Sequence, residues 1–261
     1  MKYIFPKLPE IEDKIKSQKY MALLLDFDGT ISPIVKKPES ACLPEKTRNI
    51  LKKINEIFPV VIVTGRPLNV IKKKIGVRQF LYAASHGWER NFGVKFRKKI
   101  VPKFVLKKLN QFRKIVEKIK EYYPSLIIEK KPYSVTFHYH LMPTGQKKSL
   151  KGWLEKFFKI VHKQTSIKVF YDKETIEILP GLNWTKGNIA KLALKYLHKK
   201  NSKKFTPIYI GDSLTDEDAF RALKKGITIR VGKNETSAAK WYLRDQSEVN
   251  IFLKWLLSLK I

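Results

Sequence analysis

Two aspartates directly follow the most hydrophobic strand that the sequence predicts. The segment MALLLDFDGT, residues 21–30, puts Asp26 and Asp28 after five apolar residues and before Gly29. A buried carboxylate without a partner is costly, so acids at a strand end indicate a site. Side chains two residues apart on a strand share a face. Both acids could therefore address one site if the strand continues, while Gly29 permits a turn. The alternative is an exposed turn with incidental acids.

Two further stretches carry groups suited to a phosphoryl oxygen. VVIVTGR ends on Thr64 and Arg66, and a hydroxyl with adjacent backbone amides can hold phosphate oxygens. Thr64 could equally cap a helix. In NWTKGN, Lys186 starts a predicted helix, where a cation is locally unfavourable and indicates a nearby anion. The alternative is an ordinary surface lysine.

A fourth stretch, YIGDSLTDEDAF, gathers acids after a strand. Asp212 follows Gly211, and Asp216 lies four residues further on. Carboxylates at a strand end suit a hard cation such as Mg²⁺. An acidic helix N-terminus, capped by Thr215 or Asp216, would explain residues 216–218 but not Asp212.

The elements that must position these groups alternate between strand and helix at both ends of the chain. Short all-apolar strands between helices predict an α/β fold, a Rossmann-like parallel sheet covered on both faces. Ligands bind such sheets at the carboxyl ends of the strands. Residues 88–181 instead predict a smaller α+β domain, with partly alternating strands and two long helices. We expect a core of residues 1–87 plus 182–261 with this domain inserted.

Composition limits the class of protein. The 261 residues are 43% hydrophobic, enough for a packed core, and Cys42 is the single cysteine. One cysteine excludes an internal disulfide or a multi-cysteine zinc site and suits a reducing compartment. No segment reaches the ~20 apolar residues of a membrane span. We therefore expect a cytoplasmic protein without a membrane partner.

The net charge of +31 is the feature that a small-molecule enzyme does not require. Such a charge is typical of nucleic-acid binders. Residues 91–180 hold 21 Lys and Arg against 7 Asp and Glu, and the other 171 residues hold 33 against 16. Because the excess is spread widely and is mostly lysine, we favour a surface that attracts anionic substrates. Nucleic acid stays open as a partner.

The order of the four stretches (DFDGT, TGR, a lysine at a helix start, GDSLTD) resembles the haloacid-dehalogenase-like (HAD) superfamily of aspartyl-phosphate phosphatases. The resemblance implies that Asp26 is the nucleophile and that Asp28 is the acid and base. It implies a Mg²⁺ ion held by Asp26, the backbone carbonyl of Asp28 and Asp212, with Asp216 in the outer shell. Thr64 and Lys186 would hold the phosphoryl group.

A closer resemblance, to trehalose-6-phosphate phosphatases, spans nearly the whole chain. Its blocks are LLLDFDGTISPI, VVIVTGR, ASHGWE, IEKKPYSVTFHYH, IEILPGLNWTKGNIA and GDSLTDEDAF. It implies Mg²⁺-dependent hydrolysis of trehalose 6-phosphate and an inserted α+β cap. The implied substrate-binding residues are Arg66, Ser85, His86 and Gly87 in the core and Glu129, Lys131 and His138 in the cap. Without the family, Glu129 could be a strand-edge acid and His138 a packed histidine.

Three positions depart from the family pattern. His140 and Leu179 stand where arginines are usual, and arginine is not exchangeable for either residue at a bidentate contact. Ser213 replaces the second acid of Gly-Asp-Asp. The alternatives are hydrolysis of another sugar phosphate, of the sucrose-phosphate or glycosyl-phosphoglycerate type, or a basic nucleic-acid-binding protein on this fold. Partnership with a trehalose-phosphate synthase is a further possibility that the sequence leaves open.

Overall fold

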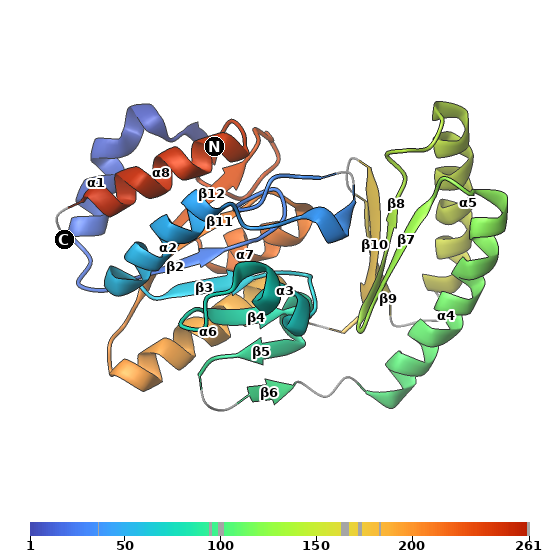
Figure 1. Cartoon of the computed structure of the whole chain (residues 1–261), viewed down its shortest axis with the longest axis horizontal. Coiled ribbons are helices and arrows are strands. Elements are labelled where there is room, and N and C mark those ends of the chain that lie inside the picture. Colours follow the sequence, from blue (N-terminus) through green and yellow to red (C-terminus); the bar gives the residue numbers. More distant parts are fainter. Residues whose placement is uncertain are drawn as a thin grey trace. The chain divides into compact units, whose positions relative to one another are not determined.

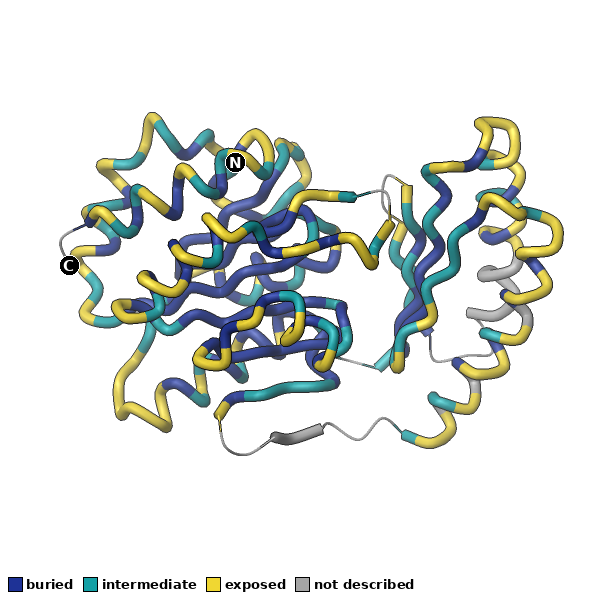
Figure 2. Tube along the Cα trace, viewed as in Figure 1, coloured by how far each residue is buried: buried dark blue, intermediate teal, exposed yellow. Residues whose placement is uncertain are grey.

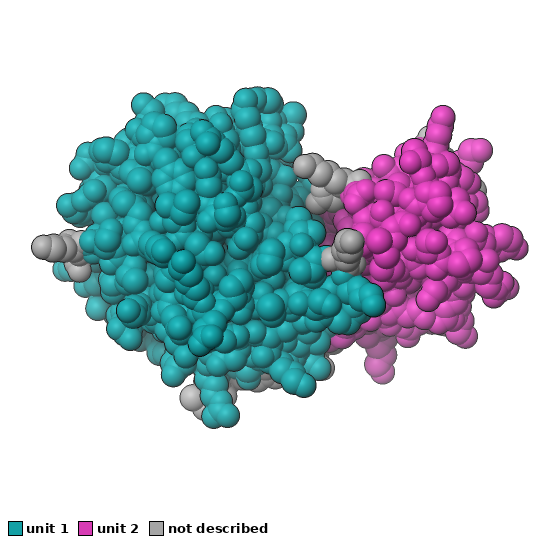
Figure 3. All heavy atoms as spheres, turned by 45° about the horizontal axis from the view of Figure 1, so that its top comes forward, with its two compact units in different colours: residues 1–98, 185–261 teal, residues 99–184 magenta. Residues whose placement is uncertain are grey.

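The computed structural model forms two compact units (Figure 3), residues 1–98 plus 185–261 and residues 99–184. The structure describes residues 1–35, 37–93, 96–98, 102–162, 167–171, 174–182 and 184–259. We expected the inserted domain to begin at residue 88, whereas the small unit begins at residue 99. The boundary lies later because β5 (Glu89–Asn91) pairs with β4 (Leu81–Ala84) inside the large unit.

The large unit contains a nine-stranded sheet in the described part of the chain, in the order β1-β13-β12-β11-β2-β3-β4-β5-β6 (Figure 1). Neighbours from β1 to β4 are parallel, whereas β5 and β6 join antiparallel at the edge. The remaining strands are β1 (Lys2–Tyr3), β2 (Met21–Leu25), β3 (Val60–Val63), β6 (Phe96–Lys98), β11 (Thr206–Gly211), β12 (Ile227–Val231) and β13 (Trp241–Leu243).

Helices cover both faces of this sheet, as the all-apolar strands require (Figures 1 and 2). One face packs on α1 (Leu8–Lys16), α2 (Glu45–Ile57), α3 (Leu68–Ile75) and α8 (Gln246–Ser258) in a single hydrophobic cluster. The other face carries α6 (Lys186–Asn201) and α7 (Glu217–Ala222), which pack against each other. Short 3₁₀ turns are η1 (Phe5–Lys7), η2 (Pro38–Ser40), η3 (Ser85–Gly87) and η4 (Leu214–Asp216). The predicted α/β fold with a parallel core sheet is confirmed.

The small unit is an antiparallel sheet with helices on one face. Its strand order is β7-β8-β10-β9, with β7 (Ile127–Lys131), β8 (Ser134–His138), β9 (Ile167–Tyr171) and β10 (Thr175–Pro180). The helices α4 (Lys103–Tyr122) and α5 (Thr144–His162) pack on Val135, Phe137 and the apolar residues that share their face. Because strand side chains alternate, the polar residues of β7, β8 and β10 line the opposite face.

None of the described helices is both long enough and apolar enough to cross a membrane.

Candidate active site

Three carboxylates meet at the carboxyl ends of two neighbouring strands of the large unit. Asp26 follows β2, Asp212 follows β11, and Asp216 ends η4. Each offers an oxygen within 4.8 Å of the others. The two strands are parallel neighbours, so their loops emerge at the same edge of the sheet. Oxygen ligands on this scale suit a hard divalent cation.

Lys186 lies between two of these carboxylates. Its Nζ is 3.1 Å from Asp26 Oδ1 and 2.9 Å from Asp216 Oδ1, and all three side chains are buried. The helix α6 begins at Lys186, and Thr185 caps it through a capping box with Asn188. Three carboxylates and one ammonium leave an excess of negative charge that a divalent cation would balance.

Burial and neighbouring charges shift the pKa values of Asp26 and Asp216 in opposite directions. Burial raises the pKa of Asp26 well above its usual range, and the nearby Lys186 only partly opposes this. Burial acts in the same direction on Asp216, but Lys186 and hydrogen bonds from Ser213 and Tyr209 outweigh it and lower the pKa. Burial lowers the pKa of Lys186, yet the charges of Asp216 and Asp26 dominate and raise it. Lys186 therefore stays a cation.

Asp216 is engaged by hydrogen-bond donors on both carboxylate oxygens. Its Oδ1 accepts from Lys186 Nζ at 2.9 Å and from the Tyr209 hydroxyl at 2.6 Å. Its Oδ2 accepts from the backbone N of Ser213 at 3.0 Å and from the Ser213 Oγ at 2.6 Å. Four donors occupy the sites of a carboxylate. Because these donors occupy both of its oxygens, Asp216 is better placed to stabilise the cluster through hydrogen bonds than to bind an ion directly.

The turn after β2 approaches Asp212 closely. Gly29 has φ +74°, and a Cβ at this position would clash with Asp212 Oδ2 and lie 2.6 Å from Asp212 Cγ. The next residue, Thr30, donates from its hydroxyl to Asp212 Oδ1 at 3.3 Å. Only glycine tolerates both the positive φ and the close approach. This turn and the Asp212 carboxylate therefore fix each other's position.

Asp28 lies outside the three-carboxylate cluster. The condition that the strand continues to Asp28, under which Asp26 and Asp28 would share a strand face, is not met, because β2 ends at Leu25 and Asp28 lies in the following turn. Arg66 holds Asp28 instead, with Nε 2.7 Å from Oδ2 and Nη2 2.6 Å from Oδ1. The Asp28 side chain is 45% exposed, whereas Arg66 is buried and stacks over Phe27. A bidentate pair of this kind fixes the orientation of the carboxylate.

Thr64 and the following turn organise the loop that carries Arg66. The Thr64 Oγ1 accepts from the backbone N of Arg66 at 3.2 Å. It does not cap α3, which begins at Leu68 after Pro67. Thr64 is almost fully buried, at the carboxyl end of β3.

The predicted Ser85–Gly87 turn adopts strained backbone angles. Ser85 and His86 have φ +49° and +54°, a region that costs non-glycine residues free energy. The Ser85 hydroxyl donates to Glu89 Oε2 at 2.7 Å, and the backbone N of Leu68 donates to the same oxygen at 3.1 Å. Glu89 thus ties this turn to the start of α3.

In the small unit, five polar side chains form one network on the sheet face opposite the helices. Glu129, Thr136 and Glu177 are paired in register across β7, β8 and β10. The Lys131 Nζ lies 3.1 Å from the Thr136 hydroxyl and 3.4 Å from both Glu129 and Glu177. The His138 Nε2 is 3.2 Å from Glu129 Oε2. The structure therefore brings Glu129, Lys131 and His138 together.

The two family departures of the small unit lie close to this network. Leu179 follows Glu177 by two residues on β10 and so shares its face. His140 has its ring 6.4 Å from that of His138, and its buried Nε2 has no hydrogen-bond partner among the residues that the structure describes. Neither side chain supplies the forked donor of an arginine.

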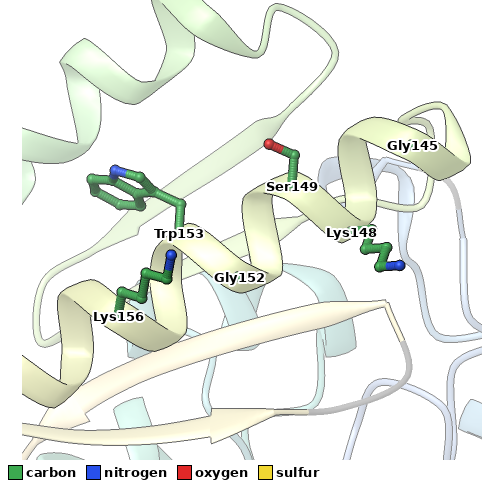
Figure 4. Close-up of a pocket in the computed structure, with 6 residues that line it drawn as sticks. All are labelled: Gly145, Lys148, Ser149, Gly152, Trp153 and Lys156. Carbon is green, nitrogen blue, oxygen red and sulfur yellow. The ribbon is translucent and has the colours of Figure 1, made fainter.

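Shallow hollows elsewhere carry none of these groups. One of about 510 Å³ follows α5 and is lined by Gly145, Lys148, Ser149, Gly152, Trp153 and Lys156 (Figure 4). Another of about 510 Å³ follows α4. Every residue that lines either hollow comes from one helix, so neither gathers groups from different elements.

Several site residues were not predicted from the sequence. They are Thr30, Tyr209, Glu89, Thr136 and Glu177, each identified by hydrogen bonds described above. Strand pairing would have indicated Thr136 and Glu177, because both lie level with Glu129 in the sheet. Tyr209 lies on β11, two residues before Gly211, but nothing in its residue type predicts the hydrogen bond to Asp216.

The strand order of the large unit is that of a HAD-like fold. The fold is shared with a haloacid dehalogenase-like hydrolase from Bacteroides thetaiotaomicron, at 17% identity and TM-score 0.58 over 91% of this chain and all of that one. A family model described as trehalose-phosphatase matches residues 24–247. The chain therefore belongs to the trehalose-phosphatase family and is a phosphoric monoester hydrolase.

Individual relatives agree with this assignment. The chain is 29% identical over 273 residues to trehalose-phosphate phosphatase B of Arabidopsis thaliana, covering 98% of this chain and 72% of the relative. It is 31% identical to a probable trehalose-phosphate phosphatase D of the same plant, covering 93% and 68%. The C-terminal domain of the C. albicans trehalose-6-phosphate phosphatase shares the fold at TM-score 0.83 and 23% identity, covering 97% of both chains.

Proposed function

We propose that the protein hydrolyses trehalose 6-phosphate to trehalose and phosphate through an aspartyl-phosphate intermediate. Family membership supports the substrate. The observation that carries the chemistry is the buried Asp26 carboxylate, 3.1 Å from the Lys186 ammonium and within the three-carboxylate cluster. A nucleophile in this setting faces a phosphoryl group whose negative charge the ammonium offsets.

Two residues perform the proposed bond changes. An Asp26 oxygen attacks phosphorus, the bond from phosphorus to the sugar oxygen breaks, and Asp28 gives that oxygen a proton. Asp28 then takes a proton from water, which attacks the same phosphorus and releases phosphate and free Asp26. The pairing with Arg66 supports this assignment, because it orients the Asp28 carboxylate. Thr64 and Lys186 are proposed to hold the phosphoryl oxygens.

Mg²⁺ is the cation that we propose for the cluster. The proposed ligands are the carboxylates of Asp26 and Asp212 and the backbone carbonyl of Asp28, with Asp216 in the outer shell. The four donors on Asp216 support its outer position. When bound, Mg²⁺ supplies positive charge that lowers the pKa of Asp26 and stabilises charge on the phosphoryl oxygens.

Sugar recognition is proposed to use both units. In the large unit, Arg66 and the Ser85, His86 and Gly87 turn would line the substrate. In the small unit, which we propose is the cap, Glu129, Lys131 and His138 would bind sugar hydroxyls, and Glu177 joins them through Lys131. Paired carboxylates, an ammonium and an imidazole discriminate against sugars that leave one of them unpaired.

A different sugar phosphate is the second candidate substrate. The observation that favours it is the absence of two forked donors, since His140 and Leu179 stand near the network of the small unit. A sucrose-phosphate or glycosyl-phosphoglycerate type of substrate would then fit better than trehalose 6-phosphate.

Phosphate release from a panel of sugar phosphates, with Mg²⁺ and then with chelator, tests the proposal. We expect metal-dependent release with the highest kcat/KM on trehalose 6-phosphate. A maximum on another sugar phosphate would keep the chemistry and change the substrate. Phosphate release that is unaffected by chelator would contradict the proposed dependence on Mg²⁺. No release from any sugar phosphate of the panel would contradict the proposed phosphatase function.

The cellular setting is also a proposal. We infer a cytoplasmic location, because a single cysteine suits a reducing compartment. A trehalose-phosphate synthase, the class of enzyme that would supply the substrate, is the proposed protein partner. Neither assignment affects the chemistry of the site.

A further inference from the structure

A buried ion pair lies beside the acidic loop and has no part in the chemistry proposed above. Arg230 and Glu217 are 9% and 6% exposed, and the Arg230 Nη1 lies 2.9 Å from Glu217 Oε1. Neither belongs to the three-carboxylate cluster. Burying two charges costs desolvation free energy, so such a pair is weak evidence for stability alone. This makes its position beside the loop informative.

Arg230 reaches the loop from the neighbouring strand. It lies on β12, in register with Gly211 on β11, the residue just before Asp212. Its Nη1 also approaches the backbone carbonyl of Ser213, at 3.3 Å, the residue just after Asp212. One guanidinium therefore holds the backbone on the C-terminal side of Asp212 from a rigid strand.

Glu217 completes the connection. It begins α7 directly after Asp216. While its Oε1 pairs with Arg230, its Oε2 accepts from the backbone N of Ala238 at 2.7 Å. The segment from Ser213 to Glu217 is thus fixed at both ends, to β12 and to the loop before β13.

We propose that Arg230 and Glu217 are positioning residues that hold Asp212 and Asp216 in the geometry of the metal site. The proposal rests on the proposed function, because it assumes that the cluster binds a divalent cation. The pair acts through the loop backbone and touches neither the cation nor the substrate. Residues that orient metal ligands in this way typically contribute about 10–100-fold to metal affinity.

Direct measurement of metal binding tests the inference without turnover. We would titrate the full chain with Mn²⁺, as a paramagnetic stand-in for Mg²⁺, and follow the free ion by electron paramagnetic resonance. Arg230→Met should weaken the Kd for Mn²⁺ by about 10-fold or more. Arg230→Lys, which keeps the positive charge but moves the donor away from the position of Nη1, should weaken it less. Arg221→Met is the matched control, because it removes an exposed arginine paired with Asp218 on the same helix.

Glu217→Gln is a milder variant that keeps the size of the side chain, should Arg230→Met fail to fold. It should also weaken Mn²⁺ binding, by more than Arg221→Met does. At raised Mg²⁺ the kcat of Arg230→Lys on the best substrate should return toward the wild-type value, which a general loss of packing would not allow.

Two results would overturn the inference in distinguishable ways. If the wild-type chain binds Mn²⁺, and Arg230→Met and Glu217→Gln (or Glu217→Gln alone, should Arg230→Met fail to fold) bind it within twofold of the wild-type Kd, the pair is structural only and the proposed function stands. If the wild-type chain itself binds no divalent cation, the metal site and the inference fail together.

Discussion

At the residue scale, the site depends on how Lys186 separates buried negative charges. Its ammonium lies within 3.1 Å of both Asp26 and Asp216, and without it two nearly dehydrated carboxylates would repel each other. Tyr209 and Ser213 complete the shell around Asp216. The replacement of an acid by Ser213 therefore adds a hydrogen-bond donor to the cluster and lowers its negative charge.

The pairing of Arg66 with Asp28 makes a prediction about proton transfer. Arg66→Lys should lower kcat on trehalose 6-phosphate by about 100-fold, a typical contribution of a positioned acid or base, because an ammonium cannot hold both oxygens of Asp28. The loss should be smaller on p-nitrophenyl phosphate, whose leaving oxygen needs no proton. Steady-state kinetics on both substrates measure the difference.

Arg78→Lys, a change at an exposed position of the same unit, is the control for this experiment. An equal loss of kcat on the two substrates would show that Arg66 acts on a step common to both, either phosphate binding or hydrolysis of the aspartyl phosphate, and not on protonation of the sugar oxygen. An unchanged kcat on both would remove Arg66 from the site altogether.

At the scale of elements, the turn after β2, which lies close to Asp212, yields a second prediction. Gly29→Ala should abolish tight metal binding, because the new Cβ would collide with the Asp212 carboxylate. Gly76→Ala is the matched control, since Gly76 has a similar φ of +68° and a Cβ added there would meet nothing within 4 Å. Both variants should lose about 1–3 kcal/mol of stability through backbone strain.

Mn²⁺ titration and thermal unfolding separate the two effects of Gly29→Ala. We expect weaker binding in Gly29→Ala alone and a lower Tm in both variants. Wild-type affinity for Mn²⁺ in Gly29→Ala would show that metal binding does not depend on the position in which Gly29 allows the Asp212 carboxylate to lie.

The cap of α8 gives a prediction about pH. Asp245 accepts from the backbone N of Ser247 at 2.8 Å, and the Ser247 hydroxyl and backbone lower the pKa of Asp245. A lowered pKa means that the stabilisation is present above the usual aspartate pKa and is lost as pH falls through the folded-state value. Asp245→Ala should therefore lower Tm at neutral pH, and the difference from wild type should shrink in acid.

Thermal unfolding of both proteins from about pH 7 to pH 3 checks this dependence on the Asp245 charge. A difference in Tm that stays constant over that range would mean that the carboxylate charge is irrelevant to the cap. Asp245→Asn, which keeps a capping oxygen, should recover most of the Tm at neutral pH.

Much of the fold followed from local patterns. The strands VVIV and LLL, the helix after Thr185 and the antiparallel small unit were all indicated by periodicity and by apolar runs. Other elements carried weaker signals. The helices α1 and α8 and the strand β13 were not predicted, and β5 and β6 join the sheet antiparallel through pairing partners that a single sequence does not display.

The candidate site was predicted where residue type alone carries the chemistry. Asp26, Asp212, Asp216 and Lys186 follow strand ends or start a helix, so the fold brings them together. The pairing of Asp28 with Arg66 and the ion pair of Glu217 with Arg230 could not be predicted in the same way. They depend on how turns orient side chains across different strands.

At the scale of the whole molecule, the net charge of +31 is the property that the chemistry leaves unexplained. The proposed substrate is an anion, and a strongly positive surface raises its rate of encounter. The same charge would attract nucleic acid, whose binding weakens steeply with salt. The charge thus has two interpretations, attraction of the anionic substrate and binding of nucleic acid, and they predict different responses to salt.

Salt dependence separates them. For a sugar phosphate, kcat/KM should fall several-fold between about 0.02 M and 0.5 M salt while kcat stays nearly constant, because screening affects encounter more than bound-state chemistry. Steady-state kinetics with Mg²⁺ held saturating measure this. Retention on DNA at physiological salt, combined with a salt-independent kcat/KM, would favour the nucleic-acid interpretation of the charge.

The most direct test of the aspartyl-phosphate mechanism is phosphate release from trehalose 6-phosphate by the wild-type chain and by Asp26→Asn, both with saturating Mg²⁺. We predict turnover by the wild-type chain and none above background by Asp26→Asn, because an amide cannot form the acyl phosphate. Unchanged Tm in the variant would show that the fold is intact. Hydrolysis by Asp26→Asn at the wild-type rate would contradict the mechanism.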